Sequence, residues 1–157
     1  MTASAWPRTL PLPDAAATEA LGHRLAPLLR SGDVVALSGD LGAGKTTLAR
    51  ALIQTLMQAE IPVPSPTFTL VQHYNAPNNS VIAHYDWYRL RVPQEVVELD
   101  FEEDCANAIT LVEWPQRAAQ YLPARTLTVT LHQDIAAARA ATFSGSPAWL
   151  ARLAPLF

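Results

Sequence analysis

The sequence feature that most constrains the fold of this chain is the segment at residues 39–46, GDLGAGKT. It matches the pattern G-x-x-x-x-G-K-[ST], which chance alone produces in roughly one chain in two hundred of this length. The segment follows the apolar run Val34–Ser38 and precedes an amphipathic helical pattern that begins at Lys45. A buried strand, a glycine-rich loop and a helix in that order predict a phosphate-binding loop in an α/β fold.

Each residue type in this loop has a physical reason. Glycines allow backbone angles that turn successive N–H groups toward one anion, and the start of the helix adds its positive dipole end. Lys45 reaches the β- and γ-phosphates, and Thr46 offers a hydroxyl to magnesium. The alternative is a glycine turn followed by a solvated lysine. The residues expected to contact a bound nucleoside triphosphate are Gly39, Asp40, Leu41, Gly42, Ala43, Gly44, Lys45, Thr46 and Thr47.

A magnesium site also needs a carboxylate close to the loop, normally at the end of a neighbouring strand. Glu113 and Asp86 each close an apolar run, so both are candidates, and both are equally typical of a surface carboxylate at a strand end. The polar residues His84 and Arg89 lie near Asp86 in the sequence. Each fits either the same site or an ordinary structural role.

Thr67 lies in the proline-rich connection that follows the loop helix. Many triphosphatases place there a mobile segment whose hydroxyl senses magnesium or the γ-phosphate. A rigid proline turn that leads into a strand explains the same residues, and the local pattern by itself favours that turn.

The remaining sequence alternates between helical and strand patterns. Helices are expected over residues 14–30, 45–59, 93–99, 115–121 and 147–153, with Asp14 as the first cap and a kink or new turn at Pro27. Strands are expected over 34–38, 67–74, 80–86, 109–112 and 127–131, whereas the stretch from 136 to 157 is otherwise ambiguous. The turn-rich residues 75–79 join two strands into a hairpin. This order predicts one P-loop NTPase-like domain over residues 1–157, an α/β three-layer sandwich with a mostly parallel sheet and an antiparallel hairpin.

Composition narrows the function classes. The net charge is −3 and the pI is near 5.7, so no basic field attracts nucleic acid, and contact with RNA would need a partner. The single cysteine, Cys105, excludes an internal disulfide and fits a packing role in a reducing compartment. No run approaches the roughly 20 apolar residues that cross a bilayer, and residues 1–12 lack signal-peptide features. We therefore expect a cytoplasmic protein with no membrane contact.

Four motifs in a fixed order resemble the bacterial TsaE (YjeE) family. They are GDLGAGKTT at residues 39–47, SPTFTL at 65–70, HYDWYRL at 84–90 and LVEWP at 111–115. The resemblance covers residues 14–117 and continues more weakly to 145. The loop motif is shared by many families, but the four motifs together are specific.

The resemblance implies an ATPase component of the machinery that makes threonylcarbamoyladenosine (t6A) in tRNA, with ATP and Mg²⁺ as cofactors. It implies that Thr46 and Glu113 contact magnesium. Asp86 would be a catalytic or water-positioning carboxylate, which acts together with Lys45. Thr67 would belong to a nucleotide-sensitive segment.

The resemblance also implies that Trp114 lies near the nucleotide and Thr18 near the base. The implied partners are the TsaD and TsaB proteins, which transfer threonylcarbamoyl to an adenosine next to the tRNA anticodon. This chain would hydrolyse ATP to regulate or reset that pair, and would meet tRNA only through the complex. Asp100 departs from the family pattern, because glycine is common at its position.

Two other functions use the same loop. A small-molecule kinase needs an acceptor pocket and often a lid with several arginines, but only Arg89 and Arg91 lie between residues 59 and 109. A GTP-dependent switch commonly selects guanine through an Asn-Lys-x-Asp segment, and the sequence contains none. The kinase is therefore the main alternative.

Overall fold

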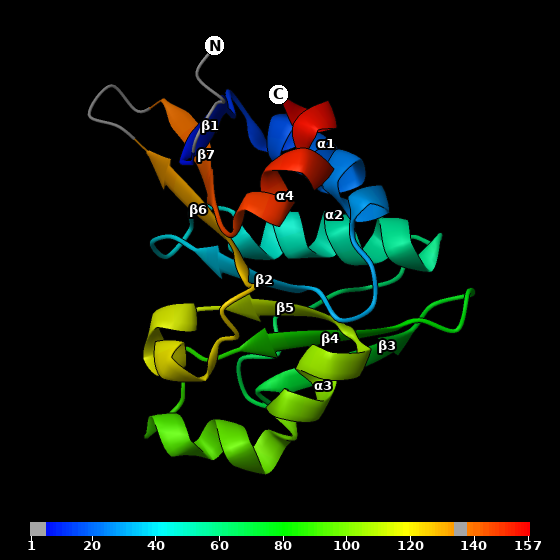
Figure 1. Cartoon of the computed structure of the whole chain (residues 1–157), viewed down its shortest axis with the longest axis vertical. Coiled ribbons are helices and arrows are strands. Elements are labelled where there is room, and N and C mark those ends of the chain that lie inside the picture. Colours follow the sequence, from blue (N-terminus) through cyan, green and yellow to red (C-terminus); the bar gives the residue numbers. More distant parts are fainter. Residues whose placement is uncertain (1–5, 134–137) are drawn as a thin grey trace.

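The centre of the molecule is a seven-stranded β-sheet with the strand order β1-β7-β6-β2-β5-β4-β3 (Figure 1). The computed structural model describes residues 6–133 and 138–157. The strands are β1 (Arg8–Pro11), β2 (Val34–Ser38), β3 (Val71–Asn75), β4 (Val81–Asp86), β5 (Ile109–Glu113), β6 (Leu127–Gln133) and β7 (Arg139–Ser144). The four central strands β6, β2, β5 and β4 run parallel, whereas β3, β7 and β1 pair antiparallel with their neighbours. The predicted α/β fold with a largely parallel sheet and a hairpin is confirmed.

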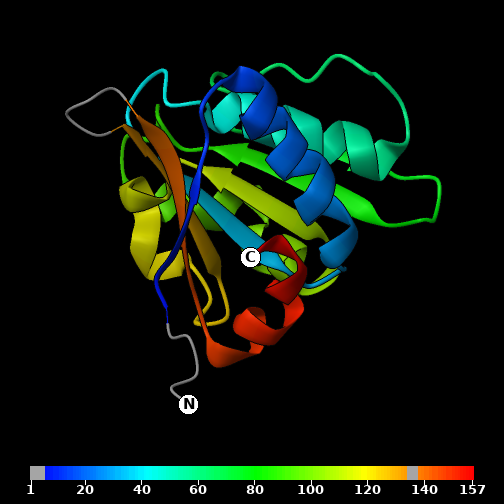
Figure 2. The ribbon, with the colours of Figure 1, turned by 90° about the horizontal axis from the view of Figure 1, so that it is seen from above.

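Helices cover both faces of this sheet. Helices α1 (Ala15–Leu25) and α2 (Lys45–Met57) lie side by side on one face (Figures 1 and 2). The other face carries η2 (Pro93–Leu99), α3 (Phe101–Asn107) and η3 (Pro115–Tyr121). The remaining short helices are η1 (Ala26–Leu28), α4 (Pro147–Arg152) and η4 (Ala154–Leu156). Within the described ranges, none of the helices has the length and apolar character that crossing a bilayer requires.

Side-chain alternation along the central strands gives each face its own apolar core. On β2, Val35 and Leu37 pack with Leu52 of α2, whereas Val34 belongs to the core that includes Phe101 of α3. Burying each large apolar side chain contributes about 1.5–3 kcal/mol, so the two cores stabilise the central part of the sheet from both faces. Because the central strands are parallel, their carboxyl ends meet at one edge of the sheet, which is where ligands of open α/β sheets bind.

Several predicted elements are confirmed at their boundaries. Strand Val34–Ser38 and the start of α2 at Lys45 are as expected, and Asp14 caps α1 by accepting a 2.8 Å hydrogen bond from the N–H of Ala17. The helical pattern that was expected to reach residue 30 ends at Leu25, and a 3₁₀ turn continues it around the proline that lacks an N–H.

Other expectations were wrong. The strand expected over 67–74 begins only at Val71, because a hydrogen bond of 2.8 Å from the Leu70 N–H to the Pro66 carbonyl closes a turn before it. Strands β1 and β7 and helix α3 were not predicted. Strand β1 ends at Pro11 on the sheet edge, where a missing N–H costs no internal ladder bond. Residues 136 and 137 of the ambiguous stretch, and residues 1–5, lie outside the described ranges.

Candidate nucleotide-binding site

The glycine-rich loop lies at the edge where the parallel strands β2, β5 and β4 end. Leu37 pairs in register with Glu113, and Glu113 pairs with Asp86, so both strand-end carboxylates lie beside the loop. Gly39 has a φ of +143°, and an added Cβ there would lie 2.5 Å from the carbonyl oxygen of Leu131. The loop therefore passes directly over β6 at a position where only glycine fits.

Lys45 is the first residue of α2, and its side chain folds back over the loop. The ammonium donates hydrogen bonds of 2.6 Å to the Gly39 carbonyl and 2.7 Å to the Asp40 carbonyl. It also lies 4.2 Å from the centre of the Trp114 ring. Burial lowers the pKa of Lys45, and the nearby carboxylates, Glu113 first among them, oppose that shift. A bound anion would favour the charged ammonium, so this group suits a phosphate.

Glu113 is hydrogen-bonded at both of its oxygens. The Thr46 hydroxyl donates to Oε1 at 2.9 Å, and His84 Nε2 lies 2.7 Å from Oε2. His84 is 0% exposed and Glu113 is 2% exposed. An ionised carboxylate only accepts, so Nε2 of His84 carries the donated proton. The other ring nitrogen of His84, Nδ1, has no hydrogen-bond partner in the described part of the chain. Within these residues, the ring of His84 therefore hydrogen-bonds through Nε2 to Glu113.

Asp86 connects the end of β4 to the segment that follows α2. Its Oδ2 accepts hydrogen bonds from the hydroxyls of Ser65 (2.5 Å) and Thr67 (3.2 Å). Its Oδ1 accepts from the backbone N–H of Tyr88 at 2.9 Å. Asp86 is buried, so these three donors replace water around its carboxylate.

Aromatic side chains form one wall of the site. Trp114 follows β5 directly and has a φ of +58°, and its ring lies 4.8 Å from the ring of Tyr88. Thr18 of α1 lies behind the loop, with its Cγ2 methyl 3.7 Å from where a Cβ on Gly44 would be. Thr18 is buried, so it supports the loop from below.

Two cavities flank the loop. The first has a volume of about 400 Å³, within the range of small-molecule sites. It is lined by Leu41, Gly42, Gly44, Lys45, Thr46, Thr47, Ser65, Thr67, Asp86, Tyr88, Glu113 and Trp114. The second, of about 230 Å³, lies on the β6 side of the loop and is lined by Asp40, Leu41, Gly42, Ala43, Leu131, His132, Gln133 and Arg139.

The fold thus brings most of the predicted site residues together. Four of them do not line the first cavity: Asp40 and Ala43 line only the second, and Gly39 and Thr18 line neither. Arg89 lies at the surface, with its guanidinium 4.4 Å from the centre of the exposed Phe68 ring. The sequence interpretation missed Ser65 and Tyr88. The only signal for Ser65 was a hydroxyl two residues before Thr67, and Tyr88 contributes a backbone N–H that no side-chain pattern reveals.

The oxygen donors at the loop fit magnesium. Across residues 6–133 and 138–157, no three His, Cys, Asp or Glu side chains form a protein-only metal cluster. Mg²⁺ usually takes one or two carboxylates and completes its shell with phosphate oxygens and water. The Thr46 hydroxyl and the Glu113 carboxylate, 2.9 Å apart, match that donor set.

A family model and curated relatives of this chain carry the same family description. A family model described as threonylcarbamoyl adenosine biosynthesis protein TsaE matches residues 12–141. The tRNA threonylcarbamoyladenosine biosynthesis protein TsaE of Rickettsia conorii is 41% identical over 114 residues, which are 73% of this chain and 65% of that protein. The chain therefore spans about two thirds of the length of that relative. The protein of the same name from Mycobacterium tuberculosis is 39% identical over 133 residues, 80% of this chain and 79% of that protein.

The fold comparison agrees. The crystal structure of YdiB from Bacillus subtilus superposes with a TM-score of 0.78 at 26% identity, and the match covers 98% of this chain and 95% of that one. The family match includes the loop, both strand-end carboxylates and Trp114. The resemblance predicted from the four motifs is confirmed, and the chain belongs to the TsaE family.

Proposed function

We propose that this chain is an ATP-hydrolysing component of the machinery that makes threonylcarbamoyladenosine in tRNA. One observation carries the proposal: Thr46 donates to Glu113 at 2.9 Å beside the ammonium of Lys45. A hydroxyl and a carboxylate suited to magnesium and a cation suited to phosphate thus surround one cavity. The names of the relatives from Rickettsia conorii and Mycobacterium tuberculosis support the assignment to tRNA modification.

ATP binding follows from the loop. The backbone N–H groups of the loop and the start of α2 would hold the triphosphate, with Lys45 at the β- and γ-phosphates. The cavity on the β6 side of the loop would take the nucleoside, and Thr18 would support the loop from behind. The preference for adenine over guanine rests on the family and on the missing Asn-Lys-x-Asp segment.

Hydrolysis needs a water molecule in line with the bond that breaks, and neutralisation of the charge that develops. Asp86 is the proposed water-positioning carboxylate, and Lys45 stabilises the developing charge. Thr46 and Glu113 would hold Mg²⁺, which supplies further charge neutralisation when it is bound. Thr67 and Ser65 both donate to Oδ2 of Asp86, so a movement of their segment would turn this carboxylate and change the rate.

The proposed partners are the TsaD and TsaB proteins, with tRNA reached only through that complex. A chain with a net charge of −3 is a poor direct ligand for a polyanion, which supports an accessory role. The chain would act as one cytoplasmic domain that regulates or resets the transferase and does not itself transfer threonylcarbamoyl.

The test is ATP hydrolysis by the purified chain, measured alone and then with the TsaD–TsaB pair and tRNA. The proposal expects turnover that the partners stimulate and that Lys45→Ala abolishes. Turnover that ignores the partners, with phosphate appearing on an added metabolite, would favour the small-molecule kinase instead.

A further inference from the structure

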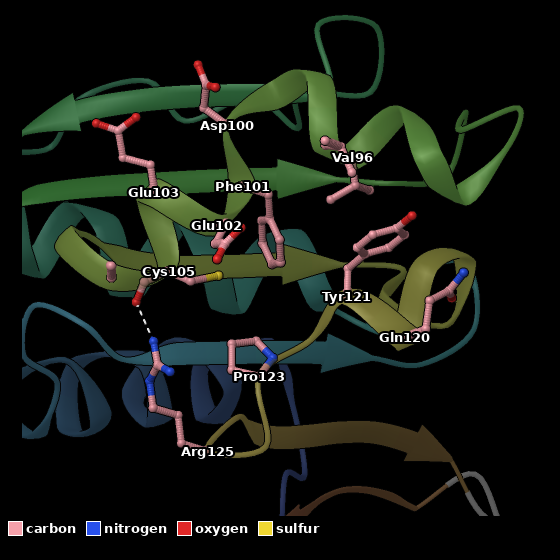
Figure 3. Close-up of a pocket in the computed structure, with 12 residues that line it drawn as sticks. Val96, Asp100, Phe101, Glu102, Glu103, Cys105, Gln120, Tyr121, Pro123 and Arg125 are labelled. Carbon is pink, nitrogen blue, oxygen red and sulfur yellow. Dashed lines mark hydrogen bonds between the residues drawn. The ribbon is translucent and has the colours of Figure 1, made fainter.

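A cavity larger than either cavity at the loop lies on the face of the sheet that carries η2, α3 and η3. Its volume is about 860 Å³, and it is enclosed by η2, α3 and η3 (Figure 3). The residues that line it are Val96, Val97, Asp100, Phe101, Glu102, Glu103, Cys105, Ala106, Gln120, Tyr121, Pro123 and Arg125. None of them lines either cavity at the loop. We call it the α3 groove.

The floor of the α3 groove is apolar and uncharged. Val96, Phe101 and Cys105 are each at most 4% exposed, and Figure 3 shows the Tyr121 ring reaching from η3 toward Val96. Burial raises the pKa of the Cys105 thiol to about 12, so this thiol is neutral in the floor. At the edge, Val97 is 63% exposed. The groove therefore offers contact area to apolar side chains and no buried polar group to orient a small polar ligand.

The rim of the α3 groove is acidic. Asp100, Glu102 and Glu103 line it, and their carboxylates have no hydrogen bond or ion pair with the described residues. Asp100 has a φ of +58°, and its side chain makes no capping bond to α3, so helix capping does not account for its carboxylate. Between residues 92 and 116 the chain has seven of its 14 Asp and Glu residues and no Lys, Arg or His.

The one basic side chain among the described lining residues does not neutralise this rim. Arg125 donates to the backbone carbonyl of Cys105 at 2.6 Å and to that of Gly32 at 3.0 Å. Figure 3 shows the first of these bonds. Arg125 makes no ion pair with Asp100, Glu102 or Glu103, and these three carboxylates lie at exposed positions.

We propose that the α3 groove docks a basic amphipathic segment of a partner protein, with apolar side chains in the floor and Lys or Arg against the rim. Apolar anchors in a desolvated pocket supply most of the binding energy at protein interfaces, and complementary charge at the rim supplies specificity and association rate. The same rim repels the phosphates of nucleic acid. The groove also adjoins the proposed ATP site through η3, which begins directly after Trp114 and ends at Tyr121. The proposal does not depend on ATP hydrolysis.

The test uses the full chain, isotope-labelled for NMR, and two synthetic helical peptides with the same apolar face. One peptide is built from Leu and Lys, and the other from Leu and Glu. The Leu–Lys peptide is expected to bind saturably and to shift the amide signals of residues 96–106 and 120–125, whereas the Leu–Glu peptide does not bind. Glu102→Lys/Glu103→Lys is expected to weaken binding at least about tenfold, because it reverses the rim charge. Val97→Ser is expected to weaken binding about threefold through the lost apolar contact.

The matched control is Glu19→Lys/Glu60→Lys, which makes the same charge change at exposed positions outside the α3 groove. It should leave peptide binding unchanged, and all variants should keep the nucleotide affinity of the parent chain. Equal weakening by both double variants, or shifts spread over the whole surface, would show non-specific attraction and overturn the proposal. It would also be overturned if tRNA shifted the groove signals, or if they moved with protein concentration alone, since the occupant would then be nucleic acid or a second copy.

Discussion

His84 Nε2 lies 2.7 Å from Oε2 of Glu113, and both side chains are almost completely buried. The other oxygen of Glu113 accepts from Thr46 at 2.9 Å. Hydrogen bonds at both oxygens fix the orientation of the carboxylate. His84 lies on β4, the strand beside β5, so β4 helps to set how Glu113 faces the loop. His84 is therefore a positioning residue for the proposed magnesium ligand.

We expect His84→Leu to weaken magnesium-dependent nucleotide binding and turnover by about 10–100-fold, because Glu113 Oε2 loses its donor in a buried site. Nucleotide affinity in EDTA should stay unchanged. His84→Gln places an amide N–H near the position of Nε2 and should restore much of the effect. Calorimetric titration of nucleotide with and without Mg²⁺ separates these outcomes. An equal loss in EDTA would show that His84 supports the fold of the site as a whole.

Lys45→Ala should abolish tight nucleotide binding, because the loop loses the only side-chain cation among the residues that line its first cavity. The 4.2 Å contact between the Lys45 ammonium and the Trp114 ring gives a direct readout. Nucleotide that draws the ammonium from this ring should change tryptophan emission, and Trp114→Phe should remove that change while other tryptophans remain. A fluorescence titration checks both variants. Emission that still responds in Trp114→Phe would place the reporter elsewhere.

Asp86→Ala should keep most of the nucleotide affinity and lose turnover, because Asp86 acts on water and on the 65–67 segment rather than on the phosphates. The hydroxyls of Ser65 and Thr67 lose their shared acceptor in this variant, so the segment should also become more sensitive to protease. Phosphate release and limited proteolysis measure the two effects. Glu60→Gln, at an exposed position, is the matched control. Normal turnover in Asp86→Ala would contradict the assigned role.

Cys105 should resist alkylation in the folded chain. Burial raises its pKa from 9.0 to about 12, so at pH 8 its thiolate fraction is roughly a thousandfold lower than that of an exposed cysteine. The same shift makes the folded state hold a proton that the unfolded state loses between pH 9 and 12, so stability falls as pH rises through that window. Iodoacetamide labelling followed by intact mass, with and without urea, tests the first point. Fast labelling without urea would show that the thiol is accessible.

Arg152→Ala should destabilise the fold by about 2–3 kcal/mol, because it leaves the buried Asp33 without its ionic partner. Arg152 donates to both Asp33 oxygens, at 2.9 and 2.6 Å, and to the Leu28 carbonyl at 2.6 Å. Arg152→Lys keeps the charge but loses the paired geometry, so it should recover only part of the loss. Urea unfolding measures the difference, with the exposed Arg50→Ala as control. A loss no larger than that of Arg50→Ala would show that the pair adds nothing to stability.

Local chemistry explains which features were predictable. The glycine pattern and the flanking apolar runs determine strand Val34–Ser38, the loop and the start of α2, because each depends on residues adjacent in the chain. Strands β1 and β7 were not predicted, because they pair with each other although they lie at opposite ends of the chain. The proline-rich sequence of β1 has no local pattern that indicates an edge strand. The single-domain organisation remains a prediction.

The amino-acid sequence by itself determined that the chain has a phosphate loop, two carboxylates at strand ends and the motif order of its family. Only the tertiary structure decided how these parts relate. It placed Glu113 between Thr46 and His84, turned Asp86 toward Ser65 and Thr67, and formed a groove with an acidic rim that shares no lining residue with the loop cavities. The physical reason is that strand register and helix packing set these distances, and both depend on contacts between residues far apart in the chain.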